Sequence, residues 1–144
     1  MSDAFDYAVW HWYKAEIIRC VDGDTVDVWV DTGFDMRIKQ RLRLYGIDTP
    51  ETRTRDSVEK KAGLMAKARV QELLEAGKCY TIWTVEKGKF GRYLARIYLD
   101  RDTCVNDMLV AEDLAVEYAG QSKNDVKRAL SEMYDRLRAK GVKL

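Results

Sequence analysis

Residues 25–45 read TVDVWVDTGFDMRIKQRLRLY, and their two alternating segments predict a β-hairpin. Valine occupies every second position within residues 25–31. Over residues 36–45, Met36, Ile38, Leu42 and Leu44 share one face, and four cations share the opposite face, which are Arg37, Lys39, Arg41 and Arg43. Because successive side chains of a strand point to opposite faces, we expect each segment to have one apolar and one more polar face. The segment TGFD, residues 32–35, is typical of the turn between them.

The alternating pattern continues outward from this hairpin in both directions. Residues 13–21 precede it as a further strand, and residues 79–85 and 92–99 follow as two more. Apolar side chains recur at helical spacing in three other segments, which are residues 58–76, 106–112 and 123–139. The order of three strands, a helix, two strands and then helices predicts an α+β fold, mainly β. By analogy, we expect a five-stranded OB-fold barrel with about three helices.

The length and the N-terminal composition bound the class of protein. A chain of 144 residues fits one domain with a single core. No stretch approaches the roughly 20 apolar residues of a membrane span. The first residues, MSDAFDYAVWHWYKAE, are acidic and aromatic, without the basic start and apolar run of a secretion signal. As written, the protein is expected in the cytoplasm with no membrane partner; export would require a signal that has been removed.

Charge is unevenly distributed, although the net charge is only +1. Residues 1–35 carry a net charge of −6, whereas residues 36–55 carry +4. If both segments fold together, a cation and a polyanion can meet at their junction. The alternative is two solvated faces that neutralise each other, and composition alone favours that alternative.

The cysteines predict free thiols rather than a metal site. Cys20, Cys79 and Cys104 are far apart, and no two of them have the spacing of zinc ligands. The chain also contains a single histidine, His11. We therefore expect three reduced and mostly buried thiols.

Two aspartates mark a candidate site for a hard cation. Asp24 follows an Asp-Gly turn at the start of a strand, and Asp48 precedes Pro50 at the end of another. Calcium prefers several oxygen ligands, which two carboxylates and the carbonyl of Thr49, held extended before proline, can supply. The alternative is that Asp24 is only a turn residue, which is common. An EF-hand loop is excluded, because the position that requires glycine holds an aspartate.

Residues near this turn can serve phosphate chemistry. Arg43 lies on the polar face of the strand at 36–45, where its guanidinium can bind a phosphate through two hydrogen bonds or form an ordinary surface ion pair. Glu51 can take a proton from a water that attacks phosphorus, or it is a solvated loop residue. Arg92 follows a glycine turn and, taken alone, is an ordinary basic residue before a strand.

Three motifs together resemble the staphylococcal nuclease (thermonuclease) family. They are VDGDTV at 21–26, RLYGIDTPE at 43–51 and KFGRYLARIY at 89–98. They occur in the family's order and at compatible spacing, and the likeness covers about residues 13–120. The resemblance implies a nuclease-like OB-fold domain over residues 13–144. Residues 1–12 form an N-terminal extension without a clear family counterpart.

The resemblance also implies an activity and the residues that perform it. The activity is calcium-dependent hydrolysis of DNA and RNA with low sequence specificity, in which the 5′ oxygen leaves and 3′-phosphate ends remain. The calcium ligands of the family fall on Asp24, Asp48 and the carbonyl of Thr49. The arginines that contact the scissile phosphate fall on Arg43 and Arg92, and the proposed general base falls on Glu51.

The sequence departs from the family at two places near the site. The simplest ungapped alignment puts Ala119 and Gln121 where the family has a tyrosine pair that packs on the substrate nucleotide, although Tyr118 is nearby. Asp113 stands where a glycine is usual, and we expect it to alter only a helix end.

Two classes of function stay open at this point. The first is an active nuclease, with a monomer slightly favoured. The second is a catalytically inactive OB-fold module that binds nucleic acid or a protein partner. The carboxylates favour the nuclease, because clustered carboxylates repel phosphate unless a cation neutralises them.

Overall fold

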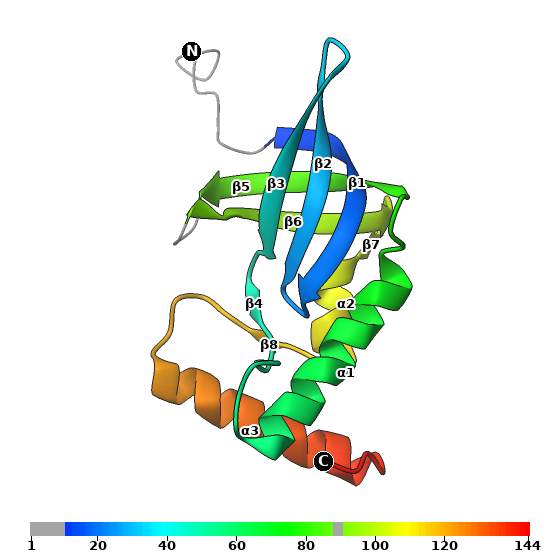
Figure 1. The fold of residues 1–144 in the computed structure, drawn as a ribbon. Helices are drawn as coiled ribbons and strands as arrows, with labels where there is room; N and C mark the ends of the chain where they lie inside the picture. Colours follow the sequence, from blue (N-terminus) through cyan, green and yellow to red (C-terminus); the bar gives the residue numbers. More distant parts are fainter. Residues whose placement is uncertain (1–10, 88–90) are drawn as a thin grey trace.

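The computed structural model describes residues 11–87 and 91–144, and it confirms the predicted α+β fold, mainly β (Figure 1). The five long strands are β1 (His11–Asp22), β2 (Thr25–Gly33), β3 (Met36–Leu44), β5 (Cys79–Lys87) and β6 (Tyr93–Asp100). Three strands of two residues each are β4 (Ile47–Asp48), β7 (Thr103–Cys104) and β8 (Val116–Glu117). The helices are α1 (Ser57–Leu73), α2 (Val105–Ala111) and α3 (Lys123–Ala139). Most of the expected extension, residues 1–12, lies outside the described residues.

The five long strands close into the predicted barrel. They pair in the order β3-β2-β1-β5-β6, and parallel pairing of β3 with β6 joins the two ends, with Leu42 opposite Tyr93. Alternate side chains fill the interior. The largest fully buried ones on these strands are Ile17, Val26, Val28, Leu42, Leu44, Ile82 and Ile97. Closure brings the end of β3 beside the start of β6, where Arg43 and Arg92 lie.

The β2–β3 hairpin projects beyond the barrel (Figure 1). Its pairing continues to Gly33 and Met36, so the turn consists of Phe34 and Asp35 alone. Both turn residues are in the left-handed region, with φ of 55° and 59°, and Phe34 is 98% exposed. The apolar face predicted for residues 36–45 is therefore buried only in the half of β3 that belongs to the barrel.

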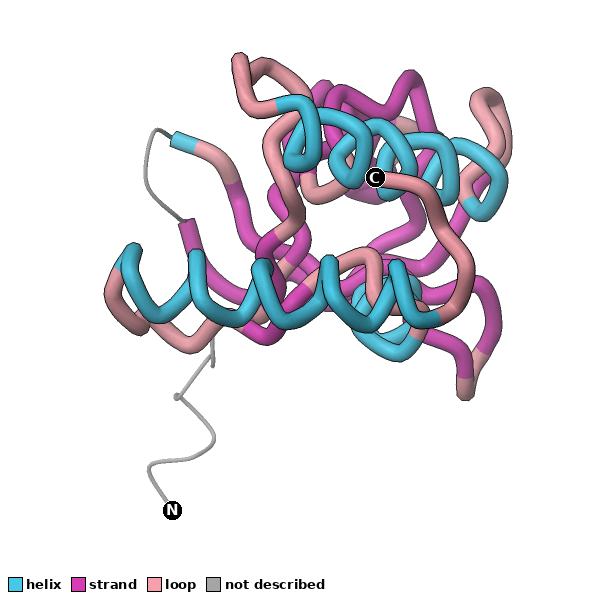
Figure 2. The backbone as a smooth tube through the Cα atoms, turned by 90° about the horizontal axis from the view of Figure 1, so that it is seen from below, coloured by secondary structure: helices cyan, strands magenta, loops and turns pink. Residues whose placement is uncertain are grey.

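The helices lie at one end of the barrel (Figures 1 and 2). Helix α1 begins after Asp56, whose carboxylate accepts hydrogen bonds from the backbone N–H groups of Val58 and Glu59. Its buried stripe packs against the barrel core; the buried residues of α1 are Ala62, Gly63, Ala66 and Val70. Helix α3 packs separately, through Val126, Leu130 and Met133, against the short strand β8. Figure 2 shows α1 and α3 on the same side of the barrel.

Asp113 ends the segment after α2 in the left-handed conformation, with φ of 58°. That conformation explains why a glycine suits this position. The aspartate gains two ion pairs instead, to Arg136 Nε at 2.8 Å and to Lys140 Nζ at 2.6 Å. The substitution thus ties the end of α2 to the C-terminal end of α3.

The cysteines are free, as expected, with Cys20 and Cys104 buried and Cys79 exposed. Burial raises the pKa of the Cys20 thiol to about 11. None of the helices in the described parts of the chain has the length and apolar character that crossing a bilayer requires.

Candidate active site

The turn between β1 and β2 packs closely on the segment that follows β4. Gly23, in the middle of the turn, has no room for a side chain. A Cβ atom there would lie 2.8 Å from Cβ of Ala66 and 3.2 Å from Oγ1 of Thr49. This close approach holds Asp24, at the end of the turn, near Asp48 on β4.

Helix α1 supports the same segment from its other side. A Cβ atom on Gly63 would lie 2.6 Å from the carbonyl oxygen of Glu51 and 2.7 Å from that of Pro50. Glycine is unfavourable inside a helix, so its presence here is explained by the contact between the helix and the loop backbone. The backbone that carries Thr49 and Glu51 is therefore held between a turn and a helix.

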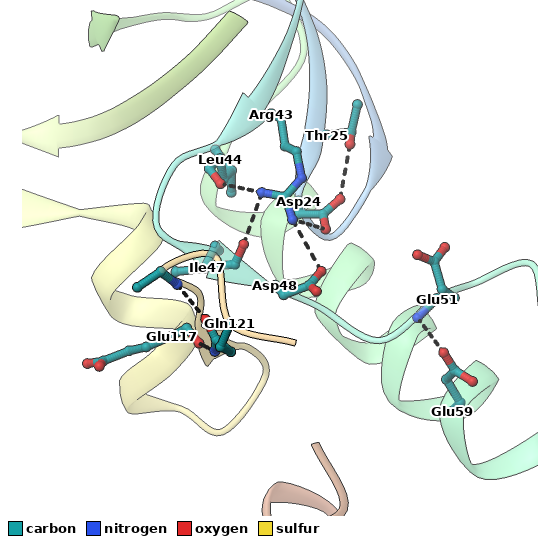
Figure 3. A network of polar contacts seen from close by, with 11 residues as sticks. Asp24, Thr25, Arg43, Leu44, Ile47, Asp48, Glu51, Glu59, Glu117 and Gln121 are labelled. Carbon is teal, nitrogen blue, oxygen red and sulfur yellow. Dashed lines mark hydrogen bonds and ion pairs between the residues drawn. The ribbon is translucent and has the colours of Figure 1, made fainter. Parts of the chain in front are cut away.

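Arg43 is at the centre of the polar contacts in Figure 3. Its Nη1 donates to the carbonyl oxygens of Leu44 at 3.2 Å and Ile47 at 3.0 Å. Its Nη2 lies 3.2 Å from Oδ1 of Asp48 and 3.6 Å from Oδ2 of Asp24. The side chain is only 17% exposed. The backbone thus fixes one end of the guanidinium, and the other end faces two carboxylates.

The two aspartates lie close enough for their charges to oppose each other. Burial raises the pKa of Asp48, Arg43 acts to lower it, and Asp24 raises it again. Oγ1 of Thr25 donates to Oδ1 of Asp24 at 3.0 Å, which orients that carboxylate. A partly buried carboxylate pair favours a positive charge in its vicinity. Arg43 supplies that charge in this structure.

The donors at this place fit a hard cation. Asp24 and Asp48 offer carboxylate oxygens, and Thr49, which is 4% exposed, adds the backbone carbonyl of a residue before proline. In residues 11–87 and 91–144, no group of three or more histidine, cysteine, aspartate or glutamate side chains is arranged to hold a metal ion. A cation here would therefore complete its shell with water and substrate oxygens rather than with further side chains.

Glu51 lies on the loop beyond β4, apart from the contacts of Arg43 in Figure 3. Its backbone N–H donates to Oε1 of Glu59 at 3.4 Å. Partial burial of the carboxyl raises the pKa of Glu51, and the neighbouring carboxylates, first of all Asp24, raise it further. A carboxyl with a raised pKa is suited to accept a proton.

One cavity of about 850 Å³ joins these groups. Five of the six predicted site residues line it, and they are Arg43, Asp48, Thr49, Glu51 and Arg92. The sixth, Asp24, reaches the cavity wall through its contact with Arg43. The structure therefore brings the six predicted residues together, while their roles stay predictions.

The comparison with protein families agrees with the motifs. The family described as staphylococcal nuclease homologue matches residues 41–144. The chain belongs to the staphylococcal nuclease family. The matched range includes all of the predicted site residues except Asp24, which precedes it.

Curated proteins that are similar to this chain have names that describe nucleases. The SPbeta prophage-derived endonuclease YokF of Bacillus subtilis (strain 168) is 35% identical over 127 residues, covering 79% of this chain and 40% of the relative. The endonuclease YncB of the same organism is 35% identical over 101 residues, covering 67% and 44%. The thermonuclease of Staphylococcus hyicus is 33% identical over 101 residues, covering 69% and 56%. The chain thus spans about half the length of these relatives.

The cavity of this staphylococcal nuclease family domain has a second wall, of which the sequence analysis named Tyr118 and Gln121 but missed Lys123 and Lys127. The wall comes from α3 and the segment before it, through Tyr118, Gln121, Lys123 and Lys127. The guanidinium of Arg43 lies 5.7 Å from the ring centroid of Tyr118. Two lysines four residues apart on one helix were a signal for a shared cationic face, but α3 was interpreted only as a packing helix.

Proposed function

We propose that this domain hydrolyses phosphodiester bonds in DNA and RNA, with calcium as the cofactor and with low sequence specificity. The observation that carries the proposal is the position of Arg43. It is fixed by two backbone carbonyls, faces Asp24 and Asp48, and lines a cavity shared with Arg92 and Glu51. Membership of the staphylococcal nuclease family and the names of the curated relatives support the same reaction.

Calcium would be held by the carboxylates of Asp24 and Asp48 and the carbonyl of Thr49. A bound calcium ion supplies Lewis acidity to a phosphate oxygen and offsets the repulsion between substrate and carboxylates. Burial raises the pKa of Asp48 and Asp24 raises it further, although Arg43 acts to lower it, so a cation beside this carboxylate would stabilise its charged form. The small number of protein ligands leaves room for a phosphate oxygen.

The side chains of the cavity divide the remaining chemistry. Glu51 accepts a proton from a water molecule as the water oxygen attacks phosphorus. Arg43 and Arg92 donate hydrogen bonds to the phosphate oxygens, whose negative charge increases in the transition state. The bond from phosphorus to the 5′ oxygen breaks, that oxygen takes up a proton, and the phosphate stays on the 3′ oxygen.

The second candidate is an OB-fold module that binds nucleic acid or a protein without cleaving it. The carboxylates argue against this function. Asp22, Asp24, Asp48, Glu51 and Glu59 lie close enough together that four of them raise the pKa of Glu51. A surface that only bound phosphate would be weakened by these negative charges.

The test is digestion of heat-denatured DNA at low salt, in calcium and then in excess chelator, by the wild type and by Asp24→Asn. We expect cleavage that requires calcium and is lost in the variant. Analysis of the ends should find 3′-phosphates. A folded protein that binds the DNA and leaves it intact in calcium would contradict the nuclease and favour the binding module.

A further inference from the structure

The outer face of the first three strands carries a surplus of positive charge that begins at the site. Cross-strand neighbours place six cations on this face, and they are Lys14, Arg19, Arg37, Lys39, Arg41 and Arg43. Four carboxylates share it, and they are Glu16, Asp22, Asp27 and Asp31. The cations of β3 occupy every second position, which places them about 6.8 Å apart along the strand. We refer to Arg37, Lys39 and Arg41 as the β3 ladder.

Asp27 does not cancel the charge of the ladder. Its carboxylate is 6% exposed and accepts hydrogen bonds from Arg19 at 3.0 Å and from Arg41 at 2.8 and 3.2 Å. One buried anion is thus shared by two arginines that remain 62% and 47% exposed. This cluster keeps one net positive charge at the surface, next to Arg43 in the register of β3.

Arg37 and Lys39, the two ladder residues nearer the hairpin turn, are available to a partner. Nη2 of Arg37 lies 3.5 Å from Oε2 of Glu16, with the side chains 50% and 35% exposed, and an ion pair this open to solvent contributes little to stability. Within residues 11–87 and 91–144, Lys39 has no ion pair within 4 Å. Trp29 lies opposite Lys39 in the register, is 37% exposed, and has the guanidinium of Arg37 5.2 Å from its ring centroid. An arginine stacked on an indole presents a flat surface to solvent.

The ladder is continuous with the candidate site. Arg43 on the same face of β3 contacts Asp24 and Asp48. The charge of Asp22, the last residue of β1, also acts on Arg41. A polyanion whose scissile phosphate is at Arg43 could therefore meet Arg41, Lys39 and Arg37 in turn as it follows the projecting hairpin of Figure 1.

We propose that the β3 ladder and Trp29 bind a single strand of nucleic acid beyond the scissile phosphate. Evenly spaced cations match the repeating charge of the backbone, and the Trp29 ring with Arg37 offers a stacking surface for a base. A single strand is favoured over a duplex because only unpaired bases expose their faces for stacking. The identity of the strand as substrate rests on the proposed function, whereas its binding along the hairpin does not.

Fluorescence anisotropy in excess chelator, with labelled oligothymidylates of about 4 and about 16 nucleotides, tests the proposal. The ladder variant is Arg37→Gln with Lys39→Gln. The matched control is Lys78→Gln with Arg101→Gln. It removes two exposed cations, one directly before β5 and one directly after β6. Wild type and control should bind the long strand much more tightly than the short one.

The ladder variant is expected to lose about tenfold in affinity for the long strand at about 50 mM salt, and its slope of log Kd against log salt should fall by about 1.4. Trp29→Ala should weaken the long strand without changing this slope, because stacking releases no counterions. Retention of the wild-type length dependence and slope by the ladder variant would overturn the proposal. If the ladder raised the affinity for a duplex as much as it raises the affinity for a single strand, the assignment to a single strand would be overturned.

Cleavage in calcium separates this inference from the proposed function. A wild type that binds the long strand through the ladder but does not cleave it contradicts the nuclease and leaves the ladder intact. A wild type that cleaves, with a ladder variant that binds the long strand equally well, supports the nuclease and overturns the ladder.

Discussion

Nη2 of Arg43 lies 3.2 Å from Oδ1 of Asp48, while Nη1 of the same side chain donates to the carbonyl oxygen of Ile47 at 3.0 Å. A single guanidinium therefore links the end of β3 to β4 and neutralises part of the carboxylate pair. Lysine cannot make these contacts together, because it has one nitrogen where arginine has a planar fork. The arrangement makes Arg43 a sensitive point for the function proposed here.

Calcium is expected to stabilise the wild-type protein against unfolding. A ligand present at about 100 times its Kd adds about 2.7 kcal/mol to the free energy of unfolding when it binds only the folded state. Asp48→Asn removes a predicted ligand, so the calcium-dependent gain should shrink. Urea unfolding of the wild type and of Asp48→Asn, each in calcium and in chelator, measures the calcium-dependent gain in the free energy of unfolding for both proteins. Equal gains would argue against a cation at Asp48.

In chelator, Asp48→Asn is expected to keep or raise the free energy of unfolding, whereas in calcium it reduces the stabilisation by the ion. The folded-state pKa of Asp48 is raised, so its contribution to stability is present below its ordinary pKa of 3.8 and is lost as the pH rises through the folded-state value. At neutral pH the carboxylate is therefore a net cost to the metal-free fold. Asn at this position should leave the metal-free protein at least as stable as the wild type.

The pH dependence of cleavage should reflect Glu51. Its pKa is raised by partial burial and by neighbouring carboxylates, so Glu51 becomes protonated at a pH above its ordinary value of 4.5. A protonated carboxyl cannot act as the base, and kcat/KM should fall as the pH drops through the raised pKa. Glu51→Gln should cleave at least about 100-fold more slowly than the wild type. A variant that retains the wild-type rate would exclude Glu51 as the base.

Gly63→Ala is expected to destabilise the protein, although alanine normally favours a helix over glycine. The new Cβ would meet the carbonyl oxygens of Glu51 and Pro50 at 2.6 and 2.7 Å, and neither backbone atom can rotate away. Overpacking of this kind costs about 1–3 kcal/mol. Thermal unfolding should show a lower Tm, whereas Ala68→Ser on the exposed side of α1 should change the free energy of unfolding by less than about 0.5 kcal/mol. A raised Tm for Gly63→Ala would refute the close contact.

Protonation of the Asp27 carboxylate in acid is expected to lower the stability of the barrel. Hydrogen bonds from Arg41 and then Arg19 hold its pKa below 3.8 against the opposing effect of burial. The stabilisation is present above that value and is lost as the pH falls through the lowered pKa. Asp27→Asn should be less stable than the wild type by about 1–3 kcal/mol at pH near neutral, with a smaller further loss in acid. Parallel loss of stability in both proteins on acidification would show that Asp27 is not responsible.

The sequence predicted the parts of the fold and site that follow from period and local chemistry. Alternation in residues 25–45 gave the hairpin, and the position of Arg43 beside the turn singled it out from the other cations of β3. The family resemblance then supplied Arg92, which local pattern alone left as an ordinary residue. Closure of β3 on β6 explains why these two arginines, far apart in sequence, line one cavity.

Other features depend on tertiary contacts that no local pattern reports. Strands β4 and β8 pair through two residues each, which is too short for a periodic signal. Tyr118 reaches Arg43 only because that pairing fixes the segment after α2. The length of the β2–β3 hairpin was visible, but its projection beyond the barrel was not, because it depends on where the pairing with β1 ends. The exposure of Phe34 follows from that projection.

The most direct test of the central claim is single-turnover cleavage of a labelled oligonucleotide in calcium by the wild type, Arg43→Lys and the control Arg101→Lys. We expect wild type and control to cleave at the same rate. Arg43→Lys should cleave at least about 100-fold more slowly while it still binds the strand, because lysine keeps the charge but cannot hold the phosphate and the backbone carbonyls together. A rate for Arg43→Lys equal to that of the wild type would contradict the account.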